Sequence, residues 1–374
     1  MEGRKVARKS GFTLIELLVV VSIIGLLIGI LLPALSTARK AAAQVKDGAQ
    51  LREVQRGLIT FSQNNRDLYP IPSALDKLNY TETGGGTAGQ ITQSGQLQAK
   101  QKQYDRTGAV LSILIYNGYV SPEQTVNPAE ADGGIRPDKD FQFQAVTQAQ
   151  DPKQALWDPG FVGAYSNRDR YIPPMNAGPA TGPNSPDNPI ALQVSVGNNS
   201  YAFQPLWGAR DSAAYWSNTT DASTPVIVNR GPTYQVPADA LGNANALYQL
   251  ANSPPGSGIG SATLLIHGGK KTWEGNLVWM DNHVSFETSP QPTTLRISYT
   301  PSAGGQSYQV ADNLFADETY ETQGVTSSNP AAIRSNAYFR QWPVGIGQSE
   351  VVQNLETLAA FDSDNNGWGG VSSN

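Results

Sequence analysis

The strongest constraint on this chain is a long apolar run close to its N-terminus. As a helix the run spans about 31 Å, close to the thickness of the hydrocarbon core of a bilayer. No other window of the sequence is long and apolar enough to span. We therefore expect one transmembrane helix. The run extends from Phe12 to Leu32 and is interrupted by Thr13, Glu16, Ser22, Gly25 and Gly29.

The eleven residues before the run carry four basic side chains and one acid. Because positive charges favour the cytoplasmic side, this leader should stay in the cytoplasm while the rest of the chain is exported. A secretory signal is cut after its apolar stretch, which is thereby removed from the mature chain. The small residue Gly11 lies before the run, so a cut there would leave the apolar helix on the mature chain.

The segment from Gly11 to Val20, GFTLIELLVV, resembles the N-terminal motif of type IV pilins and pseudopilins. The resemblance implies that a prepilin peptidase cuts between Gly11 and Phe12 and that the new amine of Phe12 is methylated. Glu16 would then be the fifth mature residue. Losing four cations and one acid would lower the formal net charge from −5 to −8.

Glu16 is the one acid inside the apolar run. A carboxylate there costs roughly 2.5–3.5 kcal/mol, so we expect it to have a function and a partner. In the pilin superfamily the partner is the free N-terminal amine of a neighbouring subunit, which sets the register of assembly. The alternative is an ordinary anchor in which Glu16 extends to the membrane interface.

Gly25, Gly29 and Pro33 recur at four-residue spacing, on one stripe of the helix. The two glycines permit close approach of a second helix, although glycine is also frequent in membrane helices in general. Pro33 lacks a backbone N–H and is expected to kink or loosen the helix.

The helical pattern continues to about Gln63 with an apolar face that needs a partner, for which an antiparallel sheet is the simplest solution. We therefore predict an α+β, pilin-like fold with long irregular insertions. Its parts are a leader (1–11), a transmembrane and assembly helix (12–33), an amphipathic continuation (34–63) and an extracytoplasmic head (64–374).

Within the head, the run from Ala109 to Tyr116 is compatible with either a strand or a short helix, and residues 81–103 have the low complexity of a loop. The predicted strands are Leu192–Val196, Ser200–Phe203, Pro225–Val228, Thr263–Ile266 and Leu295–Tyr299.

A hairpin is predicted around Asp281-Asn282, because two β-prone runs flank this dipeptide and both residues tolerate the positive φ of a two-residue turn. Together with His267-Gly268-Gly269, the hairpin and His283 resemble a C-terminal motif of large pseudopilin-like proteins of planctomycetes and verrucomicrobia. Asn282 replaces the usual glycine of that motif. In a further matching segment, Asn127 replaces a cysteine.

Composition excludes several chemistries. Without cysteine the chain has no disulfide, thiol catalysis or iron–sulfur cluster, and two histidines cannot supply a three-histidine metal site. Two interpretations are open for His267, Asp281 and His283. They bind a metal, or Asp281 and His283 are explained by the hairpin turn that they flank. No Gly-x-Ser-x-Gly elbow is present to support a Ser-His-Asp hydrolase. The pilin resemblance implies a substrate of a processing enzyme and not an enzyme. A net charge of −5 without a basic stripe argues against a nucleic-acid partner.

Near the C-terminus, Asp362, Asp364 and Asn366 precede Gly367 in the pattern of the first half of a calcium loop. The twelfth position of that loop would be Ser373 instead of a bidentate glutamate. Two interpretations are open, a calcium site completed by another segment or a solvated polar tail.

These patterns predict a filament subunit anchored in the inner membrane, with its head outside the cytoplasm. Its partners would be a prepilin peptidase and identical or related pilin subunits, in a type II secretion pseudopilus or a type IV pilus-like filament. One alternative is an anchored carbohydrate- or cargo-binding module, which would expose Trp207, Tyr215, Trp216 and Trp273 on one surface. The other is a tethered metal-dependent hydrolase.

Overall fold

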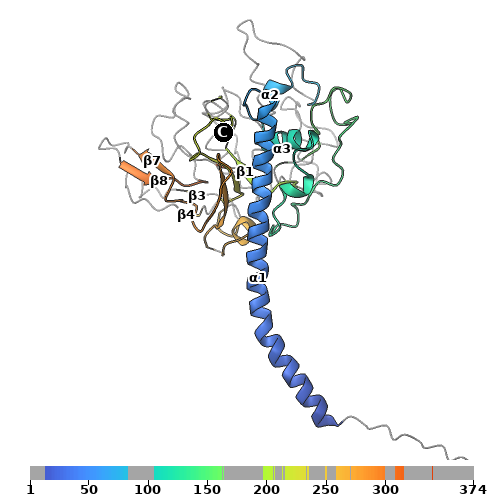
Figure 1. Ribbon diagram of the computed structural model, residues 1–374, viewed down its shortest axis with the longest axis vertical. Coiled ribbons are helices and arrows are strands. Elements are labelled where there is room, and N and C mark those ends of the chain that lie inside the picture. Colours follow the sequence, from blue (N-terminus) through green and yellow to red (C-terminus); the bar gives the residue numbers. More distant parts are fainter. Residues whose placement is uncertain are drawn as a thin grey trace, which may run out of the picture.

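A single long helix and a small antiparallel sheet organise the protein. In the computed structural model, helix α1 (Leu14–Gln63) runs from the bare lower end of the molecule through the length of the head (Figure 1). The structure describes residues 13–82, 105–161, 163, 197–204, 206, 213, 215–232, 234–235, 249–250, 258–269, 271–299, 308–315 and 339.

Helix α1 is continuous over 50 residues, as the sequence pattern predicted. Thr13 caps its first turn, and Asn64 ends it by donating its backbone N–H to the Phe61 carbonyl. Pro33 lies inside the helix. The helix changes direction in its lower half (Figure 1), as expected where a proline removes a backbone hydrogen bond.

The central sheet has four antiparallel strands in the order β1-β2-β5-β6. Strands β1 and β2 confirm the predictions at Ser200–Phe203 and Pro225–Val228, and β5 and β6 form the predicted hairpin. The four strands are β1 (Tyr201–Phe203), β2 (Pro225–Asn229), β5 (Gly275–Trp279) and β6 (Val284–Glu287).

Strand alternation sends side chains into two separate hydrophobic layers. Tyr201, Ile227 and Val278 share one core with the upper part of α1. Their neighbours in the strands, including Val228 and Leu277, join a second core on the opposite face with Trp273 and Phe315. The sheet is therefore covered on both faces, which explains why β2 and β5 are buried at every position.

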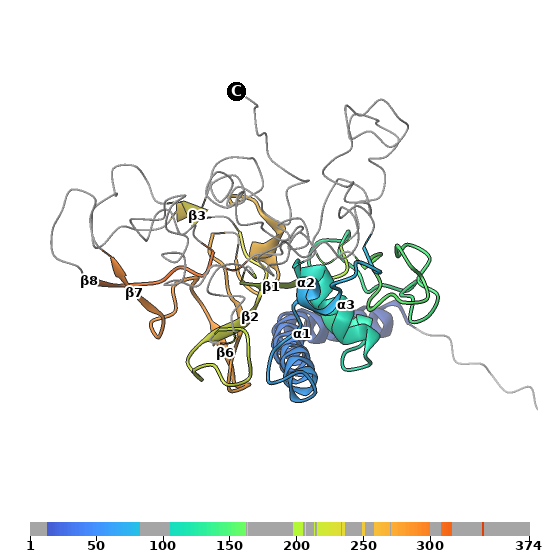
Figure 2. The ribbon, with the colours of Figure 1, turned by 90° about the horizontal axis from the view of Figure 1, so that it is seen from above.

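The second helical layer consists of α2 (Pro72–Leu75), α3 (Thr107–Tyr116) and the 3-10 helix η2 (Pro122–Thr125). Helix α3 resolves the open choice at Ala109–Tyr116 in favour of a helix. Seen from above, α1 lies between α3 and the sheet (Figure 2). Gly57 allows a close approach here, since a Cβ at that position would lie 2.7 Å from a methyl group of Val120.

The prediction of a strand at Thr263–Ile266 is wrong. Ala262–Leu265 forms a 3-10 helix, η6, whose entry is capped by Ser261 accepting from the Thr263 N–H. This local capping bond favours a helical turn over an extended strand. Strand β7 (Arg296–Tyr299) confirms the prediction at Leu295–Tyr299 and pairs with β8 (Tyr308–Ala311), while β3 (Tyr234–Gln235) pairs with β4 (Gln249–Leu250).

The β5–β6 connection is longer than the predicted two-residue turn. The Asn282 N–H donates to the Trp279 carbonyl at 2.9 Å, and the Trp279 N–H donates to the His283 carbonyl at 3.1 Å. Positive φ occurs at Asn282 (67°) but not at Asp281. These features define a three-residue loop that ends in a left-handed residue, the next commonest hairpin geometry. The predicted strand at Leu192–Val196 lies outside the described residues.

Candidate functional site

The lower part of α1 is an apolar surface that the described residues of the head leave uncovered. Every residue from Thr13 to Ala42 is exposed, and the large apolar side chains between Leu14 and Leu35 are 45–80% exposed. This stretch is long and apolar enough to cross a membrane. A soluble monomer rarely exposes an apolar patch of this extent, so the surface is built for lipid or for other helices.

Glu16 completes a capping box at the start of this helix. Its Oε2 accepts from the backbone N–H and from the hydroxyl of Thr13, both at 2.8 Å, while Thr13 Oγ1 accepts from the Glu16 N–H. The carboxylate therefore has a partner within its own chain. Gly11 and Phe12, the predicted processing site, lie outside the described residues.

Gly25 and Gly29 present open backbone on the bare helix, since a Cβ at either position would meet nothing within 4 Å. Within the described chain, neither glycine is required by the monomer's own packing. The stripe of Gly25, Gly29 and Pro33 is thus free for contacts outside the monomer.

Where α1 enters the head, the buried side chain of Asp47 joins the helix to the sheet. Four polar groups surround its two oxygens. Oδ1 accepts from the Tyr201 hydroxyl at 3.2 Å and from Asn229 Nδ2 at 3.1 Å, and Oδ2 lies 2.6 Å from Asn276 Nδ2 and 3.0 Å from His267 Nε2. Burial, and after it the charge of Asp47, raise the pKa of Tyr201 well above its usual value, so the hydroxyl keeps its proton and donates.

His267 belongs to this buried cluster and not to an open site. Its side chain is 4% exposed, and Nε2 lies between Asp47 Oδ2 and Asn127 Nδ2, 3.2 Å from the latter. The residue after His267 is glycine because there is no room for a side chain: a Cβ at Gly268 would lie 2.6 Å from the Thr272 carbonyl oxygen. At Gly269 a Cβ would meet nothing within 4 Å.

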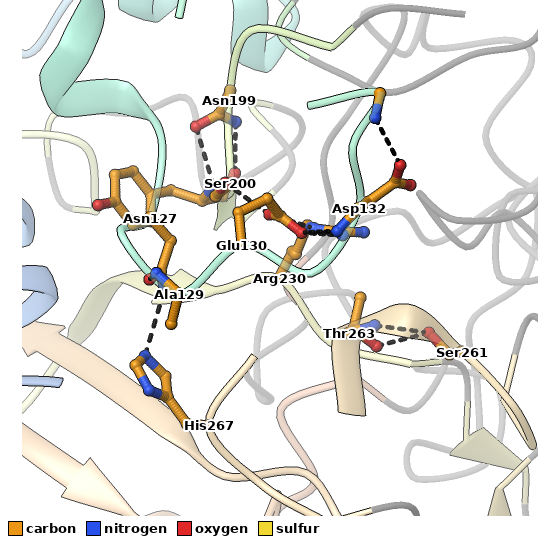
Figure 3. A network of polar contacts seen from close by, with 12 residues as sticks. Asn127, Ala129, Glu130, Asp132, Asn199, Ser200, Arg230, Ser261, Thr263 and His267 are labelled. Atoms are coloured by element: carbon orange, nitrogen blue, oxygen red, sulfur yellow. Dashed lines mark hydrogen bonds and ion pairs between the residues drawn. The ribbon is translucent and has the colours of Figure 1, made fainter. Parts of the chain in front are cut away.

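A second buried pair stabilises the loop that follows η2. Arg230 donates to both carboxylate oxygens of Glu130, at 3.0 Å from Nε and 2.5 Å from Nη2, and the Ser200 hydroxyl donates to the same carboxylate at 2.6 Å. Figure 3 shows Glu130 between Ser200 and Arg230, with Asn127 and His267 nearby. The bidentate geometry is typical of strong arginine–carboxylate pairs.

Asp281 and His283 lie apart from His267 in the exposed hairpin loop. Their contact of 2.5 Å joins Asp281 Oδ1 and His283 Nδ1, and the His283 ring stacks on Trp279. The backbone N–H of His283, and secondarily its side chain, hold the pKa of Asp281 below its usual value. Among the described residues no group of three or more His, Asp or Glu is placed to hold a metal, so the geometry required by the hydrolase alternative is not formed.

The aromatic surface required by the binding-module alternative is also not formed by the described residues. Trp216 is 4% exposed and Trp273 is fully buried, whereas Tyr215 is 37% exposed. Trp207 lies outside the described residues, as do Asp362, Asp364 and Asn366 of the predicted calcium loop.

Sequence reasoning missed the partners of His267, above all Asp47. A signal was present, because Asp47 starts the same helical stripe as Leu51, Val54 and Leu58, all of which are buried. An acid in line with apolar residues indicates a buried polar contact. The amides of Asn229 and Asn276 gave no comparable signal, since their role depends on strand register.

Comparison with known proteins supports the N-terminal motif. Residues 6–32 match the family model of the prokaryotic N-terminal methylation motif. No curated protein and no solved structure matches the chain. The chain therefore carries the prepilin-type motif of type IV pilins and pseudopilins, placed at the start of a long helix in an α+β, pilin-like fold.

Proposed function

We propose that the protein is a prepilin-like structural subunit of a type II secretion pseudopilus or a type IV pilus-like filament. A prepilin peptidase would cut between Gly11 and Phe12, Phe12 would be methylated, and the mature chain would assemble through α1. The observation that carries the proposal is the methylation motif at residues 6–32, which leads directly into a bare, apolar helix.

In this scheme the bare helix is covered by one apolar environment before assembly and by another after it. Before assembly the bilayer covers the side chains from Leu14 to Leu35, with the head outside the cytoplasm. After assembly the same side chains pack against other copies of α1, where Gly25 and Gly29 permit close approach. Glu16 exchanges its contact with Thr13 for the N-terminal amine of a neighbouring subunit.

The buried cluster around Asp47 gives this subunit a fixed joint. Because the carboxyl group contacts strands β1, β2 and β5 together with His267, the position of the helix determines the position of the head. Force applied along α1 is then transmitted to the head through the joint. A structural subunit in a mechanical filament needs such a connection.

Replacing Glu16 tests assembly. In a host with a prepilin peptidase and assembly machinery, Glu16→Gln should be processed but absent from the sheared filament fraction, because a neutral amide cannot form an ion pair with the protonated amine. Ser22→Ala is a matched control, since Ser22 lies in the same span and its hydroxyl only donates to the Leu18 carbonyl. Filaments of Glu16→Gln at the wild-type level would contradict the proposal.

A further inference from the structure

A short exposed collar separates the apolar span from the head. The collar, Ser36–Ala42, contains Arg39 and Lys40 and no acid, and all its residues are exposed. It is about 10 Å long as a helix, similar to the headgroup layer of roughly 5–8 Å on each side of a bilayer. With Leu35 at the edge of the hydrocarbon, Arg39 and Lys40 lie at the depth of the lipid phosphates.

Within the part of the chain that the structure describes, these two cations have no acidic partner. Among the described residues, no carboxylate forms an ion pair with Arg39, Lys40 or the exposed Lys46 further along the helix. The nearest acid in the sequence, Asp47, is buried and bonded to the sheet. The collar therefore presents uncompensated positive charge.

The base of the head, residues 258–269 with Lys271, adds apolar side chains at the same end of the molecule. Ile259 is 57% and Leu265 is 52% exposed, which makes them the most exposed large apolar residues described beyond α1. The contact of His267 with Asp47 holds this segment beside the lowest buried turn of α1. Figure 1 shows the yellow-orange segment at the lower edge of the head, next to α1.

We propose that the collar and the base of the head together bind anionic phospholipid headgroups while the chain is membrane-anchored. Arg39 and Lys40 contact the phosphates, and Ile259 and Leu265 enter the interfacial layer. Lys46 and Lys271, both exposed, extend the positive surface toward the head. Basic residues at the surface and a shallow apolar contact are complementary to such a membrane. The inference rests on the membrane anchoring of α1 in the proposed function.

The absence of cysteine from the chain allows a direct measurement. Leu265→Cys and Ile259→Cys, each labelled with an environment-sensitive fluorophore, are reconstituted as full chains in vesicles of phosphatidylcholine alone or with one third phosphatidylglycerol. We expect a blue shift and protection from an aqueous quencher in the anionic vesicles, both reduced by high salt. Ala222→Cys is the control and should stay quenched in both.

Ala222 suits this control because its exposed loop lies at the other end of the head, near the end of α1. There, the Asn218 N–H donates to the Asp67 carbonyl. Two double variants then test the collar. Arg39→Gln with Lys40→Gln should remove most of the lipid-dependent protection. Arg52→Gln with Arg56→Gln removes the same charge higher on α1 and should preserve it.

Equal quenching of labelled Leu265→Cys in both vesicle types would overturn the proposal, as would an unchanged response of the Arg39 and Lys40 double variant. Protection that follows the protein-to-lipid ratio instead of the phosphatidylglycerol content would assign the surface to a second copy of the chain and overturn it too. Release of the chain by alkaline carbonate would contradict the membrane anchor itself. This outcome distinguishes a failure of the proposed function from a failure of the lipid-binding proposal alone.

Discussion

The two halves of α1 follow opposite rules of burial. The lower half, from Leu14 to Leu35, is the most apolar stretch of the chain and is exposed throughout. The upper half is more polar, yet it buries Leu51, Val54, Leu58 and Phe61 against the sheet and α3. The difference shows that one continuous helix is built for two surroundings, one of them supplied by the head and the other by lipid or further helices.

Asp47 marks the boundary between these halves. It is the first fully buried side chain of α1, and its carboxyl group contacts residues of three strands and His267, which follows η6. Such a cluster adds directional contacts where apolar packing alone would let a helix slide. We interpret it as the feature that fixes the register of the helix on the sheet.

Replacing Asp47 should have the largest effect on the head. Asp47→Ala removes the carboxylate that contacts four buried polar groups, of which Asn276 keeps its bond to the Gln44 carbonyl, and is expected to cost about 3–5 kcal/mol of unfolding free energy. Asp47→Asn keeps one acceptor oxygen and should cost less. Urea unfolding of the full chain in detergent, followed through the buried tryptophans, measures both.

The control for Asp47 is Glu53→Ala on the same helix. Glu53 pairs with Arg56 at 3.1 Å on the surface, where the side chains are 41% and 66% exposed, so the loss should stay below about 1 kcal/mol. A small effect of Asp47→Ala, equal to that of Glu53→Ala, would contradict the role given to the boundary residue.

The buried Glu130–Arg230 pair provides a second test of how the head is stabilised. Glu130→Gln or Arg230→Met alone leaves one buried charge and should destabilise by about 3 kcal/mol or more. The double variant should lose less than the sum of the two, because no unpaired charge is left. Additive losses in the double-mutant cycle would show that the pair does not interact.

Two glycines of α1 allow a matched comparison of its halves. Gly57→Ala places a methyl group 2.7 Å from Val120 and should destabilise the head by about 1–3 kcal/mol through overpacking. Gly25→Ala meets no atom within 4 Å and should leave head unfolding unchanged. Equal shifts of the urea midpoint by Gly57→Ala and Gly25→Ala would contradict the difference in packing between the two halves of α1.

The smallest effect is expected in the hairpin loop. Asn282 has φ 67°, and Asn282→Val should cost about 1–2 kcal/mol because a β-branched residue is strained there. Asn282→Gly should be neutral or stabilising, since glycine accepts this conformation and the Asn282 Oδ1 has no hydrogen-bond partner among the described residues. A stability order with valine above glycine would contradict the observed loop.

Local patterns predicted the parts of the fold that depend on local chemistry. The apolar run and the periodicity up to Gln63 indicated α1, Pro33 indicated its change of direction, and β-prone runs indicated β1, β2 and the hairpin. The prediction at Thr263–Ile266 was wrong because a serine cap outweighs β propensity over so short a segment. At Asp281-Asn282 composition indicated the turn, but not its length.

The contacts of the joint could not be predicted, because they combine residues distant in the sequence. His267 stood out as part of a motif, but its partner Asp47 lies 220 positions earlier, and their meeting depends on how the sheet packs on α1. Likewise, the pairing of Glu130 with Arg230 depends on tertiary structure. The residue types indicated polar contacts at these sites, and only the fold shows that the contacts are buried within the head.

The most direct test of the central claim is the mass and N-terminal sequence of the protein from membranes of a host that contains a prepilin peptidase. The account predicts a mature chain that begins at methylated Phe12, and a Gly11→Ala variant that keeps its leader. A wild-type chain that begins at Met1, or one cut beyond Leu32, would contradict it.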